Sequence, residues 1–149
     1  MRAVIQRVLK ASVKTEGVET ARIGRGVLVL LGITTSDSGE DARYLAEKTA
    51  YLRIFPDEAD KMNLSVLDIE GEILVVSQFT LYADCRKGRR PSYASAAPAD
   101  IAEALYESYV KELLKFTPKV CTGCFQKMME VLLINDGPVT LLLDSGKNF

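Results

Sequence analysis

One stretch of continuous apolar sequence restricts the fold of this chain more than any other. Residues Val27 to Leu31 consist only of valine and leucine. The run is far too short to span a bilayer. It also lacks the alternation of a half-exposed strand, so it is typical of a strand buried on both faces. Ile73 to Val76 repeat the pattern, and we therefore expect two buried strands within one sheet.

Shorter strands are expected around these runs. Segments rich in valine and isoleucine, or with alternating apolar residues, predict strands over Arg2 to Val8, Ala11 to Thr15, Val18 to Ile23, Met129 to Leu133 and Val139 to Leu143. The pair Asp136-Gly137 predicts a tight turn before the last of these strands.

Two helices are expected between the strands. Apolar residues at helical spacing predict a first helix that is capped by Ser36, Asp37 or Ser38 and ends before Pro56. A second helix is predicted to begin near Pro98 and to bury a stripe formed by Ile101, Leu105, Tyr109 and Leu113. These elements predict a single α+β domain over residues 1–149. Its sheet is expected to be mixed, mostly antiparallel and curled towards a barrel, with two main helices.

The absence of histidine restricts the chemistry of the chain. It excludes Ser-His-Asp and Cys-His catalysis and histidine-bound metal sites. The net charge of −1, from 19 basic and 20 acidic side chains, is not typical of a protein that coats nucleic acid. The first residues lack the apolar run of a signal peptide. We therefore expect a soluble, cytoplasmic protein without a membrane partner.

Ser77, Gln78, Phe79 and Thr80 follow directly after the apolar run that ends at Val76. Loops after buried strands are common positions for ligand-binding residues, and N–H groups that leave a sheet there can stabilise an oxyanion. A polar strand end that satisfies its own backbone is the more common origin of such a segment. The segment alone therefore predicts a candidate site and no particular reaction.

Residues Asn135 to Thr140 hold a less common combination, because a proline follows Asp136-Gly137 at the start of a strand. The proline removes a ladder donor and fixes the local backbone, and Gly137 permits dihedrals that other residues avoid. A hairpin turn is the more common origin of an Asp-Gly pair. The sequence leaves the cis or trans state of the Gly137–Pro138 bond open.

Taken together, the two segments resemble the paired signatures of the D-aminoacyl-tRNA deacylase (D-tyrosyl-tRNA deacylase) family, whose members remove D-amino acids from mischarged tRNA. Further segments resemble the family in the same order: Gln6 to Val8, Ala11 to Val13, Lys61 to Leu64, Gly88 to Ser92 and Thr122 to Phe125. The resemblance covers essentially the whole chain. It implies a hydrolase that cleaves the ester bond of D-aminoacyl-tRNA and of glycine mischarged to tRNA-Ala.

The resemblance also implies a homodimer in which Gly137 and Pro138 form a cis-proline element that reaches into the partner's active site. Carbonyl oxygens of this element would hold the α-ammonium group of the substrate. An L side chain would then collide with backbone, whereas a D side chain or glycine would avoid it. Arg7 and Asn135 would support the element, and Phe125 would form a wall of the adenosine pocket.

The same resemblance assigns the chemistry to Ser77, Gln78, Phe79 and Thr80, with the N–H groups of Phe79 and Thr80 near the oxyanion. An aminoacyl ester is already activated, so positioning and oxyanion stabilisation serve it more than a strong base. A ribose hydroxyl of the tRNA could help to activate water. Two alternatives stay open. One is an esterase or amidase with Thr80 or Ser77 as covalent nucleophile, although no base lies beside Thr80 in the sequence. The other is a tRNA-binding module without catalysis.

Two further motifs carry alternatives of their own. Arg86, Lys87, Arg89 and Arg90 place four positive charges within five residues, which predicts either contact with tRNA phosphates or a solvated loop. Cys121 and Cys124 have the spacing of a metal or redox motif, but without histidine they are better explained as small thiols beside a strand. No metal, organic cofactor or DNA partner is expected.

Overall fold

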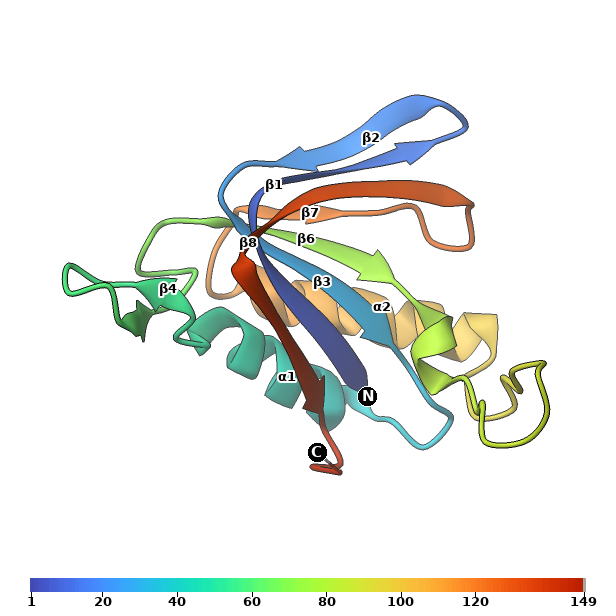
Figure 1. Ribbon diagram of the computed structural model, residues 1–149. Helices are drawn as coiled ribbons and strands as arrows, with labels where there is room; N and C mark the ends of the chain where they lie inside the picture. The colour runs from blue at the N-terminus through green and yellow to red at the C-terminus, as the bar shows by residue number, and fades with distance from the viewer. Residues whose placement is uncertain (149) are drawn as a thin grey trace.

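The computed structural model describes residues 1–148, in which two helices cover one face of a curled sheet (Figure 1). In chain order the elements are β1 (Arg2–Thr15), β2 (Val18–Ile23), β3 (Gly26–Gly32), α1 (Gly39–Tyr51), β4 (Phe55–Pro56), β5 (Met62–Leu64), β6 (Glu72–Ser77), the 3-10 helix η1 (Phe79–Tyr82), α2 (Ala99–Leu114), β7 (Val120–Thr122) and β8 (Met129–Asp144). No helix among these described residues is long and apolar enough to cross a membrane.

The main sheet runs in the order β2-β1-β3-β6-β7, and β8 also pairs with β1. β1 is antiparallel to β2, β3 and β8, whereas β6 is parallel to both β3 and β7. The predicted fold class is therefore confirmed: a mixed, mostly antiparallel sheet curled towards a barrel, with two helices. Because β6 and β7 are parallel, their C-terminal ends meet at one edge of the sheet.

β1 is one long strand, where the sequence predicted two. Its first half pairs with β3 and its second half with β2, while β8 pairs with it along almost the whole length. The register shifts on both sides of Val8, and the next two residues, Leu9 and Lys10, are exposed. The break in apolar alternation is thus a bulge that bends the strand and does not end it. This bend lets the sheet curl over itself.

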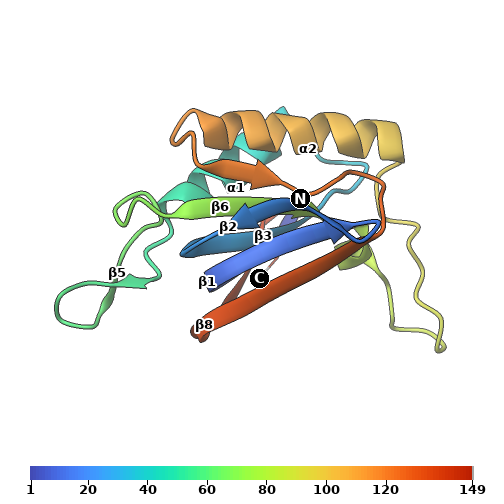
Figure 2. The same cartoon turned by 90° about the horizontal axis from the view of Figure 1, so that it is seen from above.

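Each face of β3 is buried in a different apolar cluster, as its continuous apolar run predicts. Val27, Val29 and Leu31 pack in the cluster that faces the helices, whereas Leu28 belongs to a second cluster on the opposite face. Figure 2 shows both helices on the same side of the sheet. The other face is closed by the curled part of the sheet, through residues of β1, β2 and β8. The protein therefore buries both sheet faces with helices on only one.

The two helices confirm the prediction with one correction. Ser38 is the N-cap of α1, and its N–H and hydroxyl both donate to the Asp41 carboxylate at 2.8 Å. In α2 the buried residues are Tyr106, Tyr109 and Leu113, whereas Ile101 is 42% exposed. A spacing of four residues overshoots a full helical turn by about 40° at each step, so the predicted stripe rotates away from the core towards its N-terminal end.

Gly26 of β3 lies against the backbone of Glu72 in β6. A Cβ at this position would be 1.8 Å from the Glu72 carbonyl oxygen, a backbone atom that cannot move without disrupting the pairing of the two strands. We expect Gly26→Ala to lower the free energy of unfolding by about 3 kcal/mol or more. Gly39→Ala is the matched control, because nothing lies within 4 Å of a Cβ there. It should remain within about 1 kcal/mol of the wild type. Urea denaturation measures both, and equal stability of the two variants would contradict the close approach.

Candidate active site

The segment from Ser77 to Thr80 leaves the sheet at the C-terminal end of β6. Ser77 is in register with Leu31 of β3, and the Gln78 N–H donates to the Leu31 carbonyl oxygen at 2.8 Å. The chain then turns into η1, whose first two residues, Phe79 and Thr80, are exposed. The first N–H groups of a helix have no acceptor inside it. Within residues 1–148 the N–H groups of Phe79 and Thr80 have no backbone acceptor, so they can serve an external one.

Arg2 ties η1 to the ends of two strands. Its guanidinium group donates to the Leu81 carbonyl oxygen at 3.0 Å, lies 4.6 Å from the centre of the Tyr82 ring and pairs with Asp144 at 3.2 Å. Burial would raise the pKa of Asp144, but hydrogen bonds, one of them from Arg2, hold that pKa below its usual value. Arg2 carries no local sequence signal for this role. Its partners are 79 and 142 positions away, so no local pattern could mark it.

Thr80 has an orienting partner and no neighbouring base. Its hydroxyl accepts a hydrogen bond from the side-chain amide of Gln78. Within residues 1–148 that hydroxyl has no hydrogen bond to a carboxylate or a lysine. A threonine hydroxyl becomes a nucleophile only when a base takes its proton. The contacts of Thr80 therefore suit a role in positioning better than a role in covalent catalysis.

Residues 136–139 leave the sheet in the middle of β8. Asn135 and Thr140 are in register with positions 8 and 6 of β1, so the single residue Arg7 faces four residues of β8. The strand continues in one direction on both sides of this segment. The predicted tight turn with a returning strand is therefore wrong, because both flanks keep their pairing with β1. We refer to residues 136–139 as the protrusion.

Gly137 and Pro138 form the exposed part of the protrusion, and the peptide bond between them is cis. The backbone of Gly137 has a φ of +128°, which L side chains rarely adopt. A Cβ at this position would also be 2.9 Å from Nη2 of Arg7 and 2.7 Å from Cγ2 of Val139. The local conformation and the packing therefore both require glycine at position 137.

The side chain of Asn135 closes the base of the protrusion. Its amide nitrogen donates to the Val139 carbonyl oxygen at 3.0 Å, and its amide oxygen accepts from the Val139 N–H at 2.9 Å. The amide thus replaces the backbone partner that Val139 loses when the strand leaves the sheet. The same nitrogen lies 3.5 Å from the Thr140 hydroxyl oxygen. Asn135 therefore ties the two ends of the protrusion together through both polar atoms of its amide.

Arg7 holds the other side of the protrusion and is 9% exposed. Its Nε donates to the Asp136 carbonyl oxygen at 3.0 Å and lies 3.1 Å from the Asp136 carboxylate. Its Nη1 donates to the Ile54 carbonyl oxygen at 2.5 Å. The planar guanidinium group spans these acceptors, whereas a lysine ammonium would offer no such fixed geometry. Arg7 thus links the protrusion to the chain that follows α1.

The two candidate segments do not meet within one subunit. Asn135, beside the protrusion, pairs with Val8, and Val8 pairs in turn with Gly26 of β3. Gly26 pairs with Glu72, the first residue of β6, so these residues form one row across the sheet. The row that contains Ser77 lies at the other end of β6. Five residues of strand separate these rows, on the order of 15 Å. In Figure 1 η1 follows the tip of β6, and β8 changes direction near its opposite end. The two candidate segments therefore lie well apart within one chain.

Phe125 lies at the same edge of the sheet as η1. It follows β7, whose Thr122 is in register with Val75 of the parallel strand β6. Its ring centre is 5.8 Å from that of Tyr106, and both rings line a surface groove between α2 and β7. The fold therefore brings Phe125 and the segment after Ser77 to the same end of the sheet, as an adenosine pocket there would require.

The basic residues lie in an exposed loop after η1. Arg86 forms a bidentate ion pair with Asp84, at 2.9 and 2.7 Å. Hydrogen bonds from Arg86 hold the pKa of Asp84 well below its usual range. Lys87, Arg89 and Arg90 are exposed and form no ion pair within residues 1–148. Three of the four predicted cations therefore remain available to an anionic partner.

The cysteines do not form a metal or disulfide site within the described chain. All three are free, and no group of three potential ligands in residues 1–148 could hold a metal ion. Burial raises the pKa of Cys121, whereas the neighbouring Thr15 hydroxyl lowers that of Cys124. The two thiols thus have separate surroundings, in keeping with small side chains beside β7.

The fold and the two segments define a class of small α+β proteins whose candidate site is built largely from main chain. A family model described as D-Tyr-tRNA(Tyr) deacylase matches residues 4–144. The chain is 62% identical to the D-aminoacyl-tRNA deacylase of Syntrophobacter fumaroxidans and 61% identical to that of Thermosipho africanus, in both cases over the full length of both chains. The chain therefore belongs to the D-Tyr-tRNA(Tyr) deacylase family, which confirms the predicted resemblance.

Two solved structures share the fold. One is titled c-Myc DNA Unwinding Element Binding Protein, with 42% identity, a TM-score of 0.92 and coverage of 97% of this chain and 98% of that one. The other is described as a probable eukaryotic D-amino acid tRNA deacylase, with 18% identity, a TM-score of 0.83 and coverage of 95% and 97%. The second likeness concerns the fold alone.

The contacts of Asn135 predict a local effect of its removal. Asn135→Ala deletes two hydrogen bonds to Val139, so we expect it to lower the free energy of unfolding by about 1 to 3 kcal/mol. Hydrogen exchange at the Val139 N–H should also become faster, because its acceptor is gone. Thr140→Val is the matched control, since its hydroxyl makes only long contacts, at 3.3 and 3.5 Å. Unchanged protection of Val139 in Asn135→Ala would contradict the proposed closure of the protrusion.

Proposed function

We propose that this chain hydrolyses the ester bond of D-aminoacyl-tRNA in the cytoplasm and releases the free D-amino acid and the tRNA. Membership of the family supports the reaction class, a hydrolase that acts on ester bonds. The observation that carries the proposal is the exposed protrusion, held by Arg7 on one side and Asn135 on the other. A rigid main-chain surface of this kind suits discrimination by shape.

The protrusion selects against L substrates by exclusion. The peptide unit that joins Gly137 to Pro138 carries a carbonyl oxygen and no N–H, because proline has none. Such an oxygen accepts a hydrogen bond from the α-ammonium group of an aminoacyl ester. With the ammonium group held there, an L side chain collides with backbone, whereas a D side chain points away. Glycine mischarged to tRNA-Ala also avoids the collision and is therefore a second substrate.

A partner copy completes the site in this proposal. The protrusion and the start of η1 lie at opposite ends of β6 in one subunit, on the order of 15 Å apart along the strands. One aminoacyl group is too small to reach both. The edge strand β8 exposes Leu132, Ile134 and Leu142, and exposed apolar edges are surfaces that homodimers bury. A homodimer places the protrusion of one subunit beside η1 of the other.

The chemistry proceeds without a protein base. The N–H groups of Phe79 and Thr80 stabilise the oxyanion that develops on the ester carbonyl, while Ser77 and Gln78 line the bound ester. Phe125 borders the terminal adenosine. A ribose hydroxyl of the tRNA helps to activate water, which suits a chain without histidine. Because an aminoacyl ester is already activated, positioning supplies much of the rate enhancement.

Two alternatives make different predictions. In one, the chain binds tRNA and cleaves nothing. In the other, Thr80 or Ser77 is a covalent nucleophile and an acyl-enzyme accumulates. The absence of a base beside Thr80 within residues 1–148 favours the main proposal over the covalent one.

Deacylation of D-Tyr-tRNA and L-Tyr-tRNA tests both the activity and its selectivity. We expect cleavage of the L ester to be about 100-fold slower or more, because a steric cost of only about 3 kcal/mol gives that ratio. Gly-tRNA-Ala should be cleaved as well. Absence of cleavage of the D ester would refute the main proposal. Similar rates for the D and L esters would refute selection by the protrusion.

Substitution of the two hydroxyl residues tests the covalent alternative. We expect Thr80→Val and Ser77→Ala to keep kcat within about tenfold of the wild type, because neither hydroxyl forms a covalent bond to the substrate in the proposed reaction. Removal of a true nucleophile would cost on the order of 10⁴-fold or more. Steady-state deacylation measures the rates, and mass spectrometry of quenched reactions detects any acyl-enzyme. A loss of that size together with a trapped adduct on the wild type would establish the covalent route instead.

A further inference from the structure

Two exposed aromatic rings at the candidate site have no role in the reaction as proposed. Phe79 and Tyr93 pack edge to face, with ring centres 5.2 Å apart and an angle of 67° between the planes. Phe79 is 55% exposed and Tyr93 is 42% exposed. Both rings therefore retain surface on which a third planar group can stack.

The position of Tyr93 is fixed on both sides by main-chain contacts. The preceding residue, Ser92, exchanges two backbone hydrogen bonds with Asp84, at 2.7 and 2.9 Å. Two residues after Tyr93, the Ser95 carbonyl oxygen accepts from the Thr34 hydroxyl at 2.5 Å. The pair of rings is thus held in place before any ligand arrives, which lowers the entropic cost of binding.

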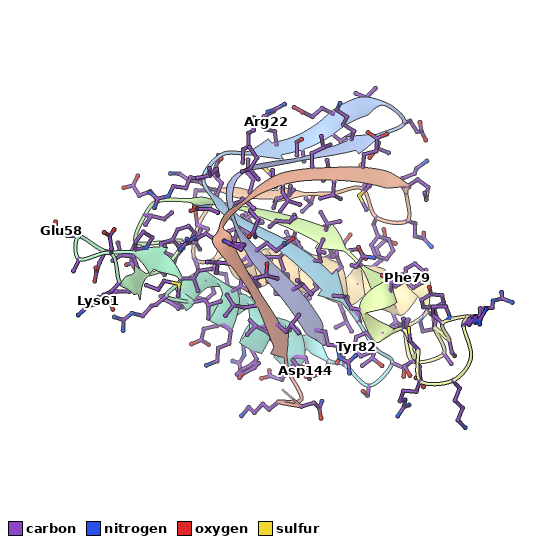
Figure 3. All side chains as sticks on the ribbon, in the orientation of Figure 1. Arg22, Glu58, Lys61, Phe79, Tyr82 and Asp144 are labelled. Atoms are coloured by element: carbon purple, nitrogen blue, oxygen red, sulfur yellow. The ribbon has the colours of Figure 1, made fainter. Side chains whose placement is uncertain are left out.

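Positive charge lies on the loop between η1 and Tyr93. The loop closed by Asp84 and Ser92 carries the three cations that form no ion pair within residues 1–148: Lys87, Arg89 and Arg90. This loop projects away from the sheet beyond η1 (Figure 1). Phe79 and Tyr82, the ends of η1, are labelled at its base in Figure 3. Exposed rings next to unpaired cations match the chemistry of an unpaired nucleic-acid strand.

We propose that Phe79 and Tyr93 form a stacking platform for the unpaired nucleotides just inside the terminal adenosine of the tRNA 3′ end. Lys87, Arg89 and Arg90 bind the phosphates of these nucleotides. The inference rests on the proposed function, in which the main chain of Phe79 faces the ester on the terminal nucleotide. The Phe79 ring therefore lies close enough to stack on the nucleotide that precedes the terminal adenosine.

The platform does not distinguish between tRNA species. A base-paired stem offers no unstacked base, so the occupant is single-stranded. Every base has a π face, and stacking on aromatic rings depends only weakly on which base is present. The platform thus binds the part of the substrate that precedes the ester without reading the body of the tRNA.

Binding of deacylated tRNA, intact or trimmed of its unpaired 3′ nucleotides, tests the platform without catalysis. We expect Tyr93→Ala to weaken binding of intact tRNA about tenfold, the order of one lost base stack. It should leave the weaker binding of trimmed tRNA unchanged. Tyr93→Phe keeps the ring and should bind intact tRNA like the wild type.

Tyr51→Ala is the matched control for loss of an exposed ring. Tyr51 is 55% exposed and packs edge to face on Phe116 with ring centres 5.4 Å apart, but it lies on α1 and outside the proposed platform. We expect no change in tRNA binding. Intact tRNA bound equally by Tyr93→Ala and the wild type would overturn the proposal, as would equal weakening for intact and trimmed tRNA.

The salt dependence of binding tests the cations. In a variant with Lys87→Gln, Arg89→Gln and Arg90→Gln, the binding constant K for intact tRNA should depend less on salt. The magnitude of the negative slope of log K against log salt concentration should decrease by about 2, because three contacts to single-strand phosphates contribute about 0.7 each. An unchanged slope would overturn the assignment of the three cations.

Deacylation separates this inference from the proposed function. On D-Tyr-tRNA, kcat/KM of Tyr93→Ala should fall about tenfold, mainly through KM. On D-tyrosyl-adenosine, which lacks the preceding nucleotides, the loss should be less than about twofold. A loss of equal size on both substrates would overturn the platform. A wild-type chain that cleaves neither substrate would contradict the proposed function, and the binding experiment would still decide the platform.

Discussion

The antiparallel pairing of β1 with β8, interrupted opposite Arg7, is the constraint on which the candidate site depends. The ladder runs from Arg2 with Asp144 to Thr15 with Met129, so the register is fixed on both sides of the interruption. Residues 136–139 must therefore leave the sheet together. Backbone groups that lose their ladder partners need new ones, and Arg7 and the Asn135 side chain provide several of them. The exposed main chain is rigid for this reason.

The strand order of the same sheet separates the two candidate segments within one chain. The parallel strands β6 and β7 end at one edge, which gathers Ser77, η1 and Phe125 there. The protrusion lies beside the opposite end of β6. In the function that we propose, chiral selection and ester activation need no shared side chain, so the two tasks can belong to separate segments. The homodimer that we propose joins the two parts.

Continuous apolar runs and local capping residues predicted the fold well. Features that depend on which strands pair with one another were not predicted. The buried runs of β3 and β6 and the capping of α1 by Ser38 agree with the structure. The break after Val8 looked like the end of a strand and is a bulge. The Asp136-Gly137 pair looked like a hairpin turn and begins a protrusion within one strand. In both cases the pairing of β1 with β8 keeps the chain extended, and local sequence carries no information about that pairing.

By itself, the sequence determined the family, the buried strands, the exclusion of histidine chemistry and the identity of both candidate segments. Only the tertiary structure decided that β8 continues past Pro138, that Arg7 and Asn135 hold the protrusion, and that Phe79 meets Tyr93 beside a basic loop. The physical reason is distance along the chain. Arg7 and Asp136 are 129 positions apart, so their contact depends on how the sheet closes, whereas apolar runs and turn residues act through their immediate neighbours.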